Sequence, residues 1–208
     1  MCNYSDAFSH LKKDIVMKSL IMKIGEKITI KDRKESNLAL AISLLVIEQQ
    51  VSFKAAITIK KRFRKIIEKK THNQILKIKD LELQSIGISF RKVEYIKNVY
   101  RYFLKSKFDF FKEEESLVIK ELTAIKGIGN WTAEMFLIFI LCKKNIFSKG
   151  DLALINSIKI NYQINNLDNK KLDRIVEKWS PYKTIACLLL WKSIEENKFA
   201  DIEKGNLS

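Results

Sequence analysis

Proline and glycine are scarce in this sequence: its 208 residues include one proline and six glycines. Apolar residues make up 47% of the chain and occur in long runs that Lys, Glu and Asn interrupt. So few residues suited to tight turns, together with so much apolar sequence, indicate a helical protein with a sizeable core. The same composition excludes wholesale disorder.

Cysteine is scarce as well, and Cys2, Cys142 and Cys187 are odd in number and far apart. This pattern fits neither a disulfide framework nor a zinc or iron–sulfur ligand set. We expect all three to be small buried hydrophobic residues in a reducing compartment.

Long apolar segments that could cross a membrane are absent too, since no run reaches the roughly 18 residues that a span requires. Residues 1–9 lack the basic and apolar regions of a secretory signal. We therefore expect a protein that is neither secreted nor bound to a membrane. Its expected location is the cytoplasm, associated with the nucleoid in a prokaryote, or the nucleus.

Acidic residues are outnumbered: 24 Asp and Glu stand against 39 Lys and Arg, which gives a formal net charge of +15. A positive field of this size favours polyanionic partners, and binding that depends on it weakens as the salt concentration rises. A proteome that uses lysine freely on protein surfaces would give the same excess. The charge therefore supports nucleic acid as a partner only modestly.

Helical periodicity recurs along the chain. Residues 36–48 are apolar nearly all round, as in a central buried helix. Ser52 and Ser89 each precede a segment with an apolar stripe, and both are placed to cap a helix. In the first of these helices the opposite face carries five basic residues, Lys54, Lys60, Lys61, Arg64 and Lys65.

The C-terminal part continues this pattern. Asp168 can cap a helix over residues 170–179, and Ser180-Pro181 has the form of a cap and first position of a last helix running to about residue 196. Residues 28–30 are the one strand-like fragment. We therefore expect an all-α fold.

Residues 122–133 (LTAIKGIGNWTA) contain two glycines, Gly127 and Gly129, between a short apolar helix and a second helix over residues 131–142. Both glycines can take positive φ and leave backbone N–H groups uncovered. With the N-terminal end of the second helix, these groups form a site for one phosphate. An ordinary helix–helix turn is the alternative. The flanking residues favour a helix-hairpin-helix, which binds the DNA backbone and reads no sequence.

Asp151 follows about twenty residues later and directly precedes an apolar helical run. A carboxylate at this position is expected to be an N-cap, and that role alone is worth about 1 kcal/mol. The cap position also has a chemical consequence, because N–H donors and the helix dipole stabilise the ionised carboxylate. An anion of this kind can stabilise a sugar that becomes oxocarbenium-like while its base leaves.

Four segments in this order resemble the helix-hairpin-helix DNA glycosylase superfamily, and the DNA-3-methyladenine glycosylase II branch in particular. They cover about residues 8–196. The segments are LLVIEQQVSFKAA at residues 44–56, GISFRKVEYI at residues 87–96, the hairpin with Asp151, and WSPYKTIA followed by Leu190-Trp191.

The resemblance implies a role for each matching residue of the active site. Asp151 matches the essential carboxylate, which stabilises the sugar cation and positions or activates water. Trp131 stands where bifunctional members carry the lysine that forms a Schiff base, so the resemblance implies hydrolysis that leaves an abasic site. Trp131, Trp191 and Met135 match positions of the base pocket, where aromatic faces attract a cationic alkylated purine. Packing in the core is an equally good account of Trp191.

The resemblance also implies DNA contacts. Gln50 matches the residue that enters the duplex and fills the gap left by the flipped nucleotide, whereas Gln49 and Ser52 could equally be ordinary turn and cap residues. Glu48 stands where the signature has glycine. The hairpin residues expected at the DNA backbone are Lys126, Gly127, Ile128, Gly129 and Thr132. The main-chain carbonyls of Thr123, Ile125 and Ile128 match those that hold a monovalent cation, Na⁺ or K⁺.

The family pattern predicts one glycosylase unit over residues 1–208, with a cleft between two helical lobes. Residues 37–134, ending in the hairpin at 122–134, would form the central lobe, and residues 1–36 with 135–208 the second. No N-terminal β-rich domain and no iron–sulfur cluster are expected. The predicted activity is that of a monomer excising alkylated purines such as 3-methyladenine from double-stranded DNA. The alternatives are excision of deaminated or oxidised bases, and a DNA-binding module without catalysis.

Overall fold

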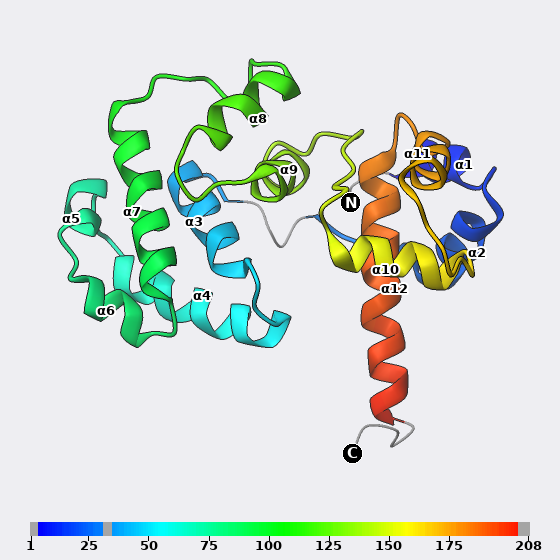
Figure 1. The fold of residues 1–208 in the computed structure, drawn as a ribbon, viewed down its shortest axis with the longest axis horizontal. Helices are drawn as coiled ribbons and strands as arrows, with labels where there is room; N and C mark the ends of the chain where they lie inside the picture. The colour runs from blue at the N-terminus through cyan, green and yellow to red at the C-terminus, as the bar shows by residue number, and fades with distance from the viewer. Residues whose placement is uncertain (1–3, 31–34, 204–208) are drawn as a thin grey trace. The chain divides into compact units, whose positions relative to one another are not determined.

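The computed structural model describes residues 4–30 and 35–203, and for residues 53 and 197–203 it describes the backbone alone. Every regular element in these ranges is a helix (Figure 1), so the predicted all-α fold is confirmed for them. The strand-like fragment at residues 28–30 forms no strand there. Ile28 has extended backbone angles and is buried, but the segment pairs with no strand.

The chain divides into two compact units, one of residues 1–32 and 142–208 and one of residues 33–141. We call them the terminal unit and the central unit. The approximate boundary expected near residue 134 falls within α9 (Asn130–Phe139), all of which belongs to the central unit.

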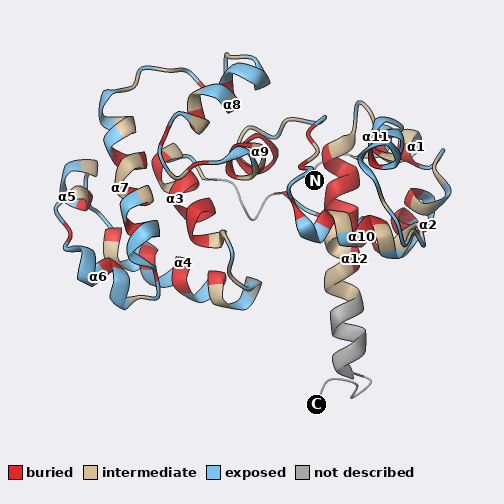
Figure 2. Ribbon diagram, in the orientation of Figure 1, coloured by how far each residue is buried: buried red, intermediate tan, exposed pale blue. Residues whose placement is uncertain are grey.

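The central unit is built around α3 (Leu38–Glu48), whose residues are buried along most of its length (Figure 2). Helices α4, α7 and α9 pack against it. The predicted caps are confirmed: Ser52 Oγ accepts the N–H of Ala55 at 3.3 Å and Ser89 Oγ that of Lys92 at 3.4 Å. The other helices of this unit are α4 (Phe53–Ile67), α5 (His72–Leu76), α6 (Asp80–Ser85), α7 (Phe90–Lys105) and α8 (Glu115–Thr123).

The terminal unit combines both ends of the chain. Its long helix α12 (Lys183–Glu203) packs against α2 (Ile15–Ile24) and α10 (Leu152–Asn161). The remaining elements are α1 (Ser5–Leu11), the 3₁₀ turn η1 (Gly25–Lys27) and α11 (Asn169–Glu177).

The start of the last helix was predicted wrongly. Residues 180 and 181 lie in a turn with a cis peptide bond between them, and α12 begins two residues after Pro181. The N–H of Tyr182 closes this turn on the carbonyl of Trp179 at 2.7 Å. The cap predicted at Asp168 is confirmed, since its carboxylate accepts the N–H of Lys171 at 2.8 Å.

A chain of hydrogen bonds joins three segments inside the terminal unit. The hydroxyl of Tyr162 donates to Oδ2 of Asp14 at 2.9 Å and accepts the indole N–H of Trp179 at 3.3 Å. The other carboxylate oxygen of Asp14 caps α2. Burial raises the pKa of Tyr162 far above its usual range, and the charge of Asp14 adds to that shift.

The cysteines only partly meet the expectation of burial. Cys187 is buried, but Cys142 is exposed. Cys142 follows the end of α9 and has a φ of 53°, so it belongs to a surface turn. Cys2 lies outside the described residues. None of the described helices combines the length and apolarity required to cross a membrane.

Candidate active site

The predicted hairpin is the turn that joins α8 to α9. Gly127 adopts a φ of 101°, as expected, but Gly129 does not: it is the N-cap of α9 with a φ of −100°. A Cβ atom on Gly127 would lie 2.0 Å from Cγ of Tyr95, whereas a Cβ on Gly129 would meet no heavy atom within 4 Å. Position 127 therefore requires glycine, and position 129 borders open space.

Backbone N–H groups are available at this turn. In the described part of the chain neither Gly127 nor Gly129 donates its N–H to an acceptor. The first hydrogen bond of α9 runs from Ala133 to the carbonyl of Gly129 at 3.1 Å, and glycine provides no side chain to cap the helix. Uncapped N–H groups at the positive end of a helix can bind a phosphate.

The other residues expected at the DNA backbone differ in exposure. Thr132 is 2% exposed and its hydroxyl accepts a hydrogen bond from Gln49 at 2.9 Å. Ile128 is buried, and its N–H donates to the carbonyl of Ile125 at 3.0 Å. Lys126 is exposed, but it forms an ion pair with Glu94 at 2.6 Å, which raises the pKa of Lys126. Among these three side chains only that of Lys126 is exposed to solvent.

The segment before Asp151 is fixed by side chains from α12. The hydroxyl of Thr184 donates to the carbonyl of Lys143 at 2.7 Å and accepts the N–H of Ile146 at 3.2 Å. Thr184 is 1% exposed, so these bonds lie in the core of the terminal unit. They hold the irregular segment that connects the end of α9 to the start of α10.

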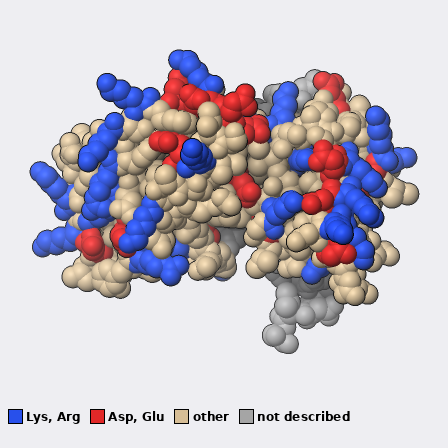
Figure 3. Space-filling view, turned by 45° about the horizontal axis from the view of Figure 1, so that its top comes forward, with Lys and Arg blue, Asp and Glu red and all other residues tan. Residues whose placement is uncertain are grey.

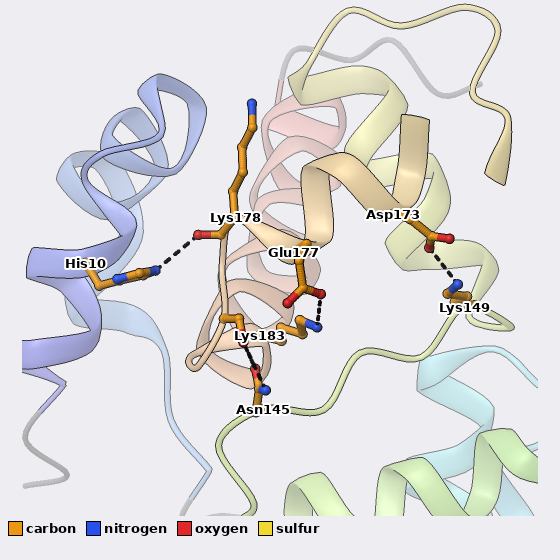
Figure 4. Close-up of polar contacts among 8 residues, drawn as sticks. His10, Asn145, Lys149, Asp173, Glu177, Lys178 and Lys183 are labelled. Atoms are coloured by element: carbon orange, nitrogen blue, oxygen red, sulfur yellow. Dashed lines mark hydrogen bonds and ion pairs between the residues drawn. The ribbon is translucent and has the colours of Figure 1, made fainter. Parts of the chain in front are cut away.

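Surface contacts hold the same segment to α11 and to the turn before α12 (Figure 4). Lys149, two residues before Asp151, forms an ion pair with Asp173 of α11 at 2.6 Å. The amide of Asn145 donates to the hydroxyl of Ser180 at 3.1 Å. The position of Asp151 is therefore set by contacts from two helices besides its own.

Asp151 is the N-cap of α10, as predicted. Its Oδ1 accepts the N–H of Leu154 at 2.9 Å and the indole N–H of Trp191 at 3.4 Å. The carboxylate is 8% exposed, and Trp191 is half-buried on α12. A backbone donor and an indole donor on a nearly buried carboxylate stabilise its negative charge.

The residues expected in a base pocket lie in both units. Trp191 is in direct contact with Asp151 in the terminal unit. Trp131 is half-buried in the first turn of α9, beside the hairpin glycines of the central unit. Met135, one turn further on, is 2% exposed and offers almost no surface to a ligand.

The turn after α3 contains the other predicted DNA contacts. Gln50 is exposed and has a φ of 55°, a conformation that side chains rarely adopt. Gln49 is half-buried, and its amide donates to the carbonyl of Gly127 at 3.3 Å and to Thr132. Ser52 caps α4. Gln49 and Ser52 thus form the contacts of ordinary turn and cap residues, and both Gln50 and Ser52 are exposed.

No site residue was predicted in α7, yet this helix supports both the turn and the hairpin. Lys92 donates to the main chain of the Gln50 turn, and Tyr95 packs against Gly127. The amide of Asn98 donates to the carbonyl of Lys126 at 3.3 Å. Lys92 and Tyr95 lie inside the segment at residues 87–96 that resembles the family, but only the folded chain reveals what they contact.

On the face shown in Figure 3, basic side chains are spread over each unit and acidic side chains are interspersed among them. Glu94 beside Lys126 and Asp173 beside Lys149 are examples of such pairs near the candidate site. Among the side chains that the structure describes, in residues 4–30 and 35–196, no three of His, Cys, Asp or Glu are grouped closely enough to hold a metal ion.

Known proteins match both the sequence and the fold. The DNA-3-methyladenine glycosylase 1 of Schizosaccharomyces pombe is 30% identical over 167 residues, which cover 76% of this chain and 72% of that protein. A solved structure of the 3-methyladenine DNA glycosylase of that yeast in complex with abasic DNA superposes with a TM-score of 0.85. It is 26% identical, and the match covers 92% of this chain and 97% of the other.

A more distant structure shares the fold alone. The 8-oxoguanine glycosylase/lyase of Clostridium acetobutylicum, solved with DNA, is 14% identical and superposes with a TM-score of 0.76 over 94% of this chain and 71% of its own. The sequence profile described as HhH-GPD superfamily base excision DNA repair protein matches residues 44–181. That match spans the Gln50 turn, the hairpin and Asp151, and the chain therefore belongs to the HhH-GPD superfamily.

Proposed function

We propose that the protein is a monofunctional DNA glycosylase that hydrolyses the N-glycosidic bond of alkylated purines such as 3-methyladenine. It would act as a monomer on double-stranded DNA and leave an abasic site. The observation that carries this proposal is the contact between Asp151 and Trp191, which puts a stabilised carboxylate beside a half-buried indole. The names of its relatives in the family support the choice of damaged base.

The chemistry follows from the charge of Asp151. When the bond between C1′ and the base nitrogen breaks, both electrons leave with the base and positive charge develops on the sugar. A fixed carboxylate stabilises that charge in the transition state. A water oxygen then bonds to C1′ and passes its proton to Asp151. An alkylated purine needs no further protonation, because its own positive charge is neutralised as it leaves.

An amine is missing where the family's lyases have one. Trp131 occupies the position of the lysine that attacks C1′, and an indole cannot form a Schiff base. An electron-rich ring can instead stack on a flipped base and attract its positive charge. We therefore assign Trp131 and Trp191 to the recognition of the base, and hydrolysis rather than strand cleavage to the reaction.

The hairpin supplies the binding of DNA in this proposal. The N–H groups of Gly127 and Gly129 and the N-terminal end of α9 would bind one phosphate. The carbonyls of Thr123, Ile125 and Ile128 would bind a monovalent cation, for which neutral oxygens are suitable ligands. The carbonyl of Ile125 already accepts the N–H of Ile128, and its second lone pair remains for a cation.

The test is an excision assay on duplexes that each carry one lesion: 3-methyladenine, hypoxanthine, uracil or oxidised guanine. We expect strand breaks at 3-methyladenine only after alkali, and no product trapped by borohydride. Asp151→Asn should abolish excision while DNA binding persists, because asparagine caps a helix as well as aspartate does. Asp168→Asn is the matched control, since Asp168 is also an N-cap and should not affect excision.

Each other outcome has a clear meaning. Excision of hypoxanthine, uracil or oxidised guanine instead would assign the same fold to deaminated or oxidised bases. Breaks without alkali, or a trapped covalent product, would contradict the monofunctional mechanism. Binding of every duplex with excision of none would identify a DNA-binding module.

A further inference from the structure

The turn after α3 is held by a lysine from a distant part of the chain. The ammonium group of Lys92 on α7 donates to the carbonyl of Ile47 at 3.0 Å and to the carbonyl of Gln49. These carbonyls lie at the C-terminal end of α3, where main-chain acceptors have no partner within the helix. Lys92 is half-buried, and the loss of solvent lowers its pKa.

The residue that follows these carbonyls is Gln50, whose φ of 55° has a cost that surrounding contacts must offset. Lys92 provides such contacts directly before it. A positive charge at the negative end of α3 is also favourable. The lysine therefore fixes the backbone from which the exposed side chain of Gln50 extends.

We propose that Lys92 is a positioning residue that holds Gln50 in the orientation needed to enter the duplex when a base is flipped out. The proposal rests on the glycosylase function proposed above. Lys92 would touch neither the damaged base nor the sugar. Its effect would be confined to the opening of the base pair, and it would leave the hydrolysis itself unchanged.

The turn and the hairpin are also joined to each other. Gln49 bridges them through its bonds to Gly127 and Thr132. Lys92, Tyr95 and Asn98 recur every three residues along one face of α7, and they contact the turn, Gly127 and Lys126 respectively. A phosphate bound at the hairpin would therefore fix where Gln50 meets the DNA.

The test compares excision of one lesion in two duplexes. In the first the lesion is paired with its normal partner, and in the second it lies opposite an abasic-site analogue, where flipping costs less. The quantity measured is the ratio of the single-turnover excision rates, paired over unpaired. We expect Lys92→Met to lower this ratio about tenfold or more, since small displacements of positioned groups have effects of this size. Lys92→Arg, which keeps the charge and the donors, should restore much of it.

Lys97→Met is the matched control. Lys97 also lies on α7 and donates to a main-chain carbonyl, that of Ile78 at 2.7 Å, but its partners are not in the Gln50 turn. This variant should lower thermal stability and leave the ratio unchanged. An equal loss on both duplexes for Lys92→Met, or the same ratio for the Lys92 and Lys97 variants, would overturn the proposal.

A second variant keeps the proposal testable if Lys92→Met does not fold. Gln50→Gly suits the positive φ and should fold normally, and it should lower the ratio as Lys92→Met does. An unchanged ratio for Gln50→Gly would show that no side chain needs positioning there and would refute the role of Lys92. If the wild-type protein excises the lesion from neither duplex, the proposed function has failed instead.

Discussion

The indole N–H of Trp191 on α12 donates to Oδ1 of Asp151 at the start of α10, over a distance of 3.4 Å. The two residues are 40 positions apart, and the packing of α10 against α12 brings them together. A tryptophan that contacts the carboxylate through its polar edge does more than pack against its neighbours.

Replacing Trp191 with phenylalanine keeps an aromatic ring and removes the donor. We expect the single-turnover excision rate to fall about fivefold, because the hydrogen bond is worth about 1 kcal/mol. Trp179→Phe is the matched control, since the indole of Trp179 is buried and donates to Tyr162. That variant should lower the melting temperature and leave the rate of the folded protein unchanged. Equal rates for wild type and Trp191→Phe would contradict the proposed role.

The two hairpin glycines should respond differently to alanine. Gly127→Ala meets both a positive φ and the ring of Tyr95, so we expect a loss of about 3 kcal/mol in unfolding free energy. Gly129→Ala adds a methyl group in open space and should cost about 1 kcal/mol or less. It should nevertheless weaken binding to damaged and undamaged duplexes alike, because that methyl lies where a phosphate would approach. Denaturant unfolding measures the loss of stability, and fluorescence anisotropy measures the binding of DNA. A binding loss confined to damaged DNA would argue against a phosphate site.

Under the proposed function, Glu94 would compete with DNA for Lys126. Removing its charge by Glu94→Gln should strengthen binding to any duplex at low salt by about 0.2–1 kcal/mol, the value of an exposed ion pair. Glu177→Gln is the matched control: it raises the net charge equally but frees Lys183 in the terminal unit. Comparing the two variants distinguishes the effect of freeing Lys126 from the effect of a higher net charge. If both variants increased affinity by the same factor, the location of Lys126 at the hairpin would have no special effect.

Alkaline pH should destabilise the protein through its buried tyrosines. Burial raises the pKa of Tyr100 and of Tyr102 to about 12, whereas in the unfolded chain both ionise near pH ~10. The unfolded state therefore releases these protons first, and stability that is constant below pH ~10 falls as the pH rises towards ~12. Denaturant titrations across this range should show the decline, and Tyr100→Phe should reduce its slope. A slope unaffected by that substitution would exclude Tyr100 as a contributor.

Local signals were sufficient for most of the helix caps. Ser52, Ser89, Asp151 and Asp168 each accept a hydrogen bond from the N–H three positions further on, so a short stretch of sequence contains both partners. The predicted start of the last helix was wrong because the local sequence there allows more than one structure. Serine followed by proline is compatible with a helix start and with a turn, and tertiary packing decided between them.

The arrangement around the candidate site depends on contacts between residues far apart in the sequence, which the periodicity of apolar residues does not predict. Lys92 and Gln49 are 43 residues apart, and Gln49 and Thr132 are 83 apart. Gln49 and Thr132 lie in two segments that resemble a DNA-binding family, and both were expected to contact DNA. In the structure their side chains form a hydrogen bond with each other. The turn and the hairpin themselves could be predicted from the sequence, but not which side chains hold them together.

The division of the chain has a consequence for biosynthesis. All of the central unit precedes residue 142, so it can complete its fold while later residues are still on the ribosome. The terminal unit cannot, because α2 packs against α12, which is synthesised after every other described helix. During translation the apolar face of α2 therefore stays without its partner helix α12 after the central unit has been synthesised. Asp151, whose partner Trp191 lies on that same helix, therefore gains its indole contact only after residue 191 has left the ribosome.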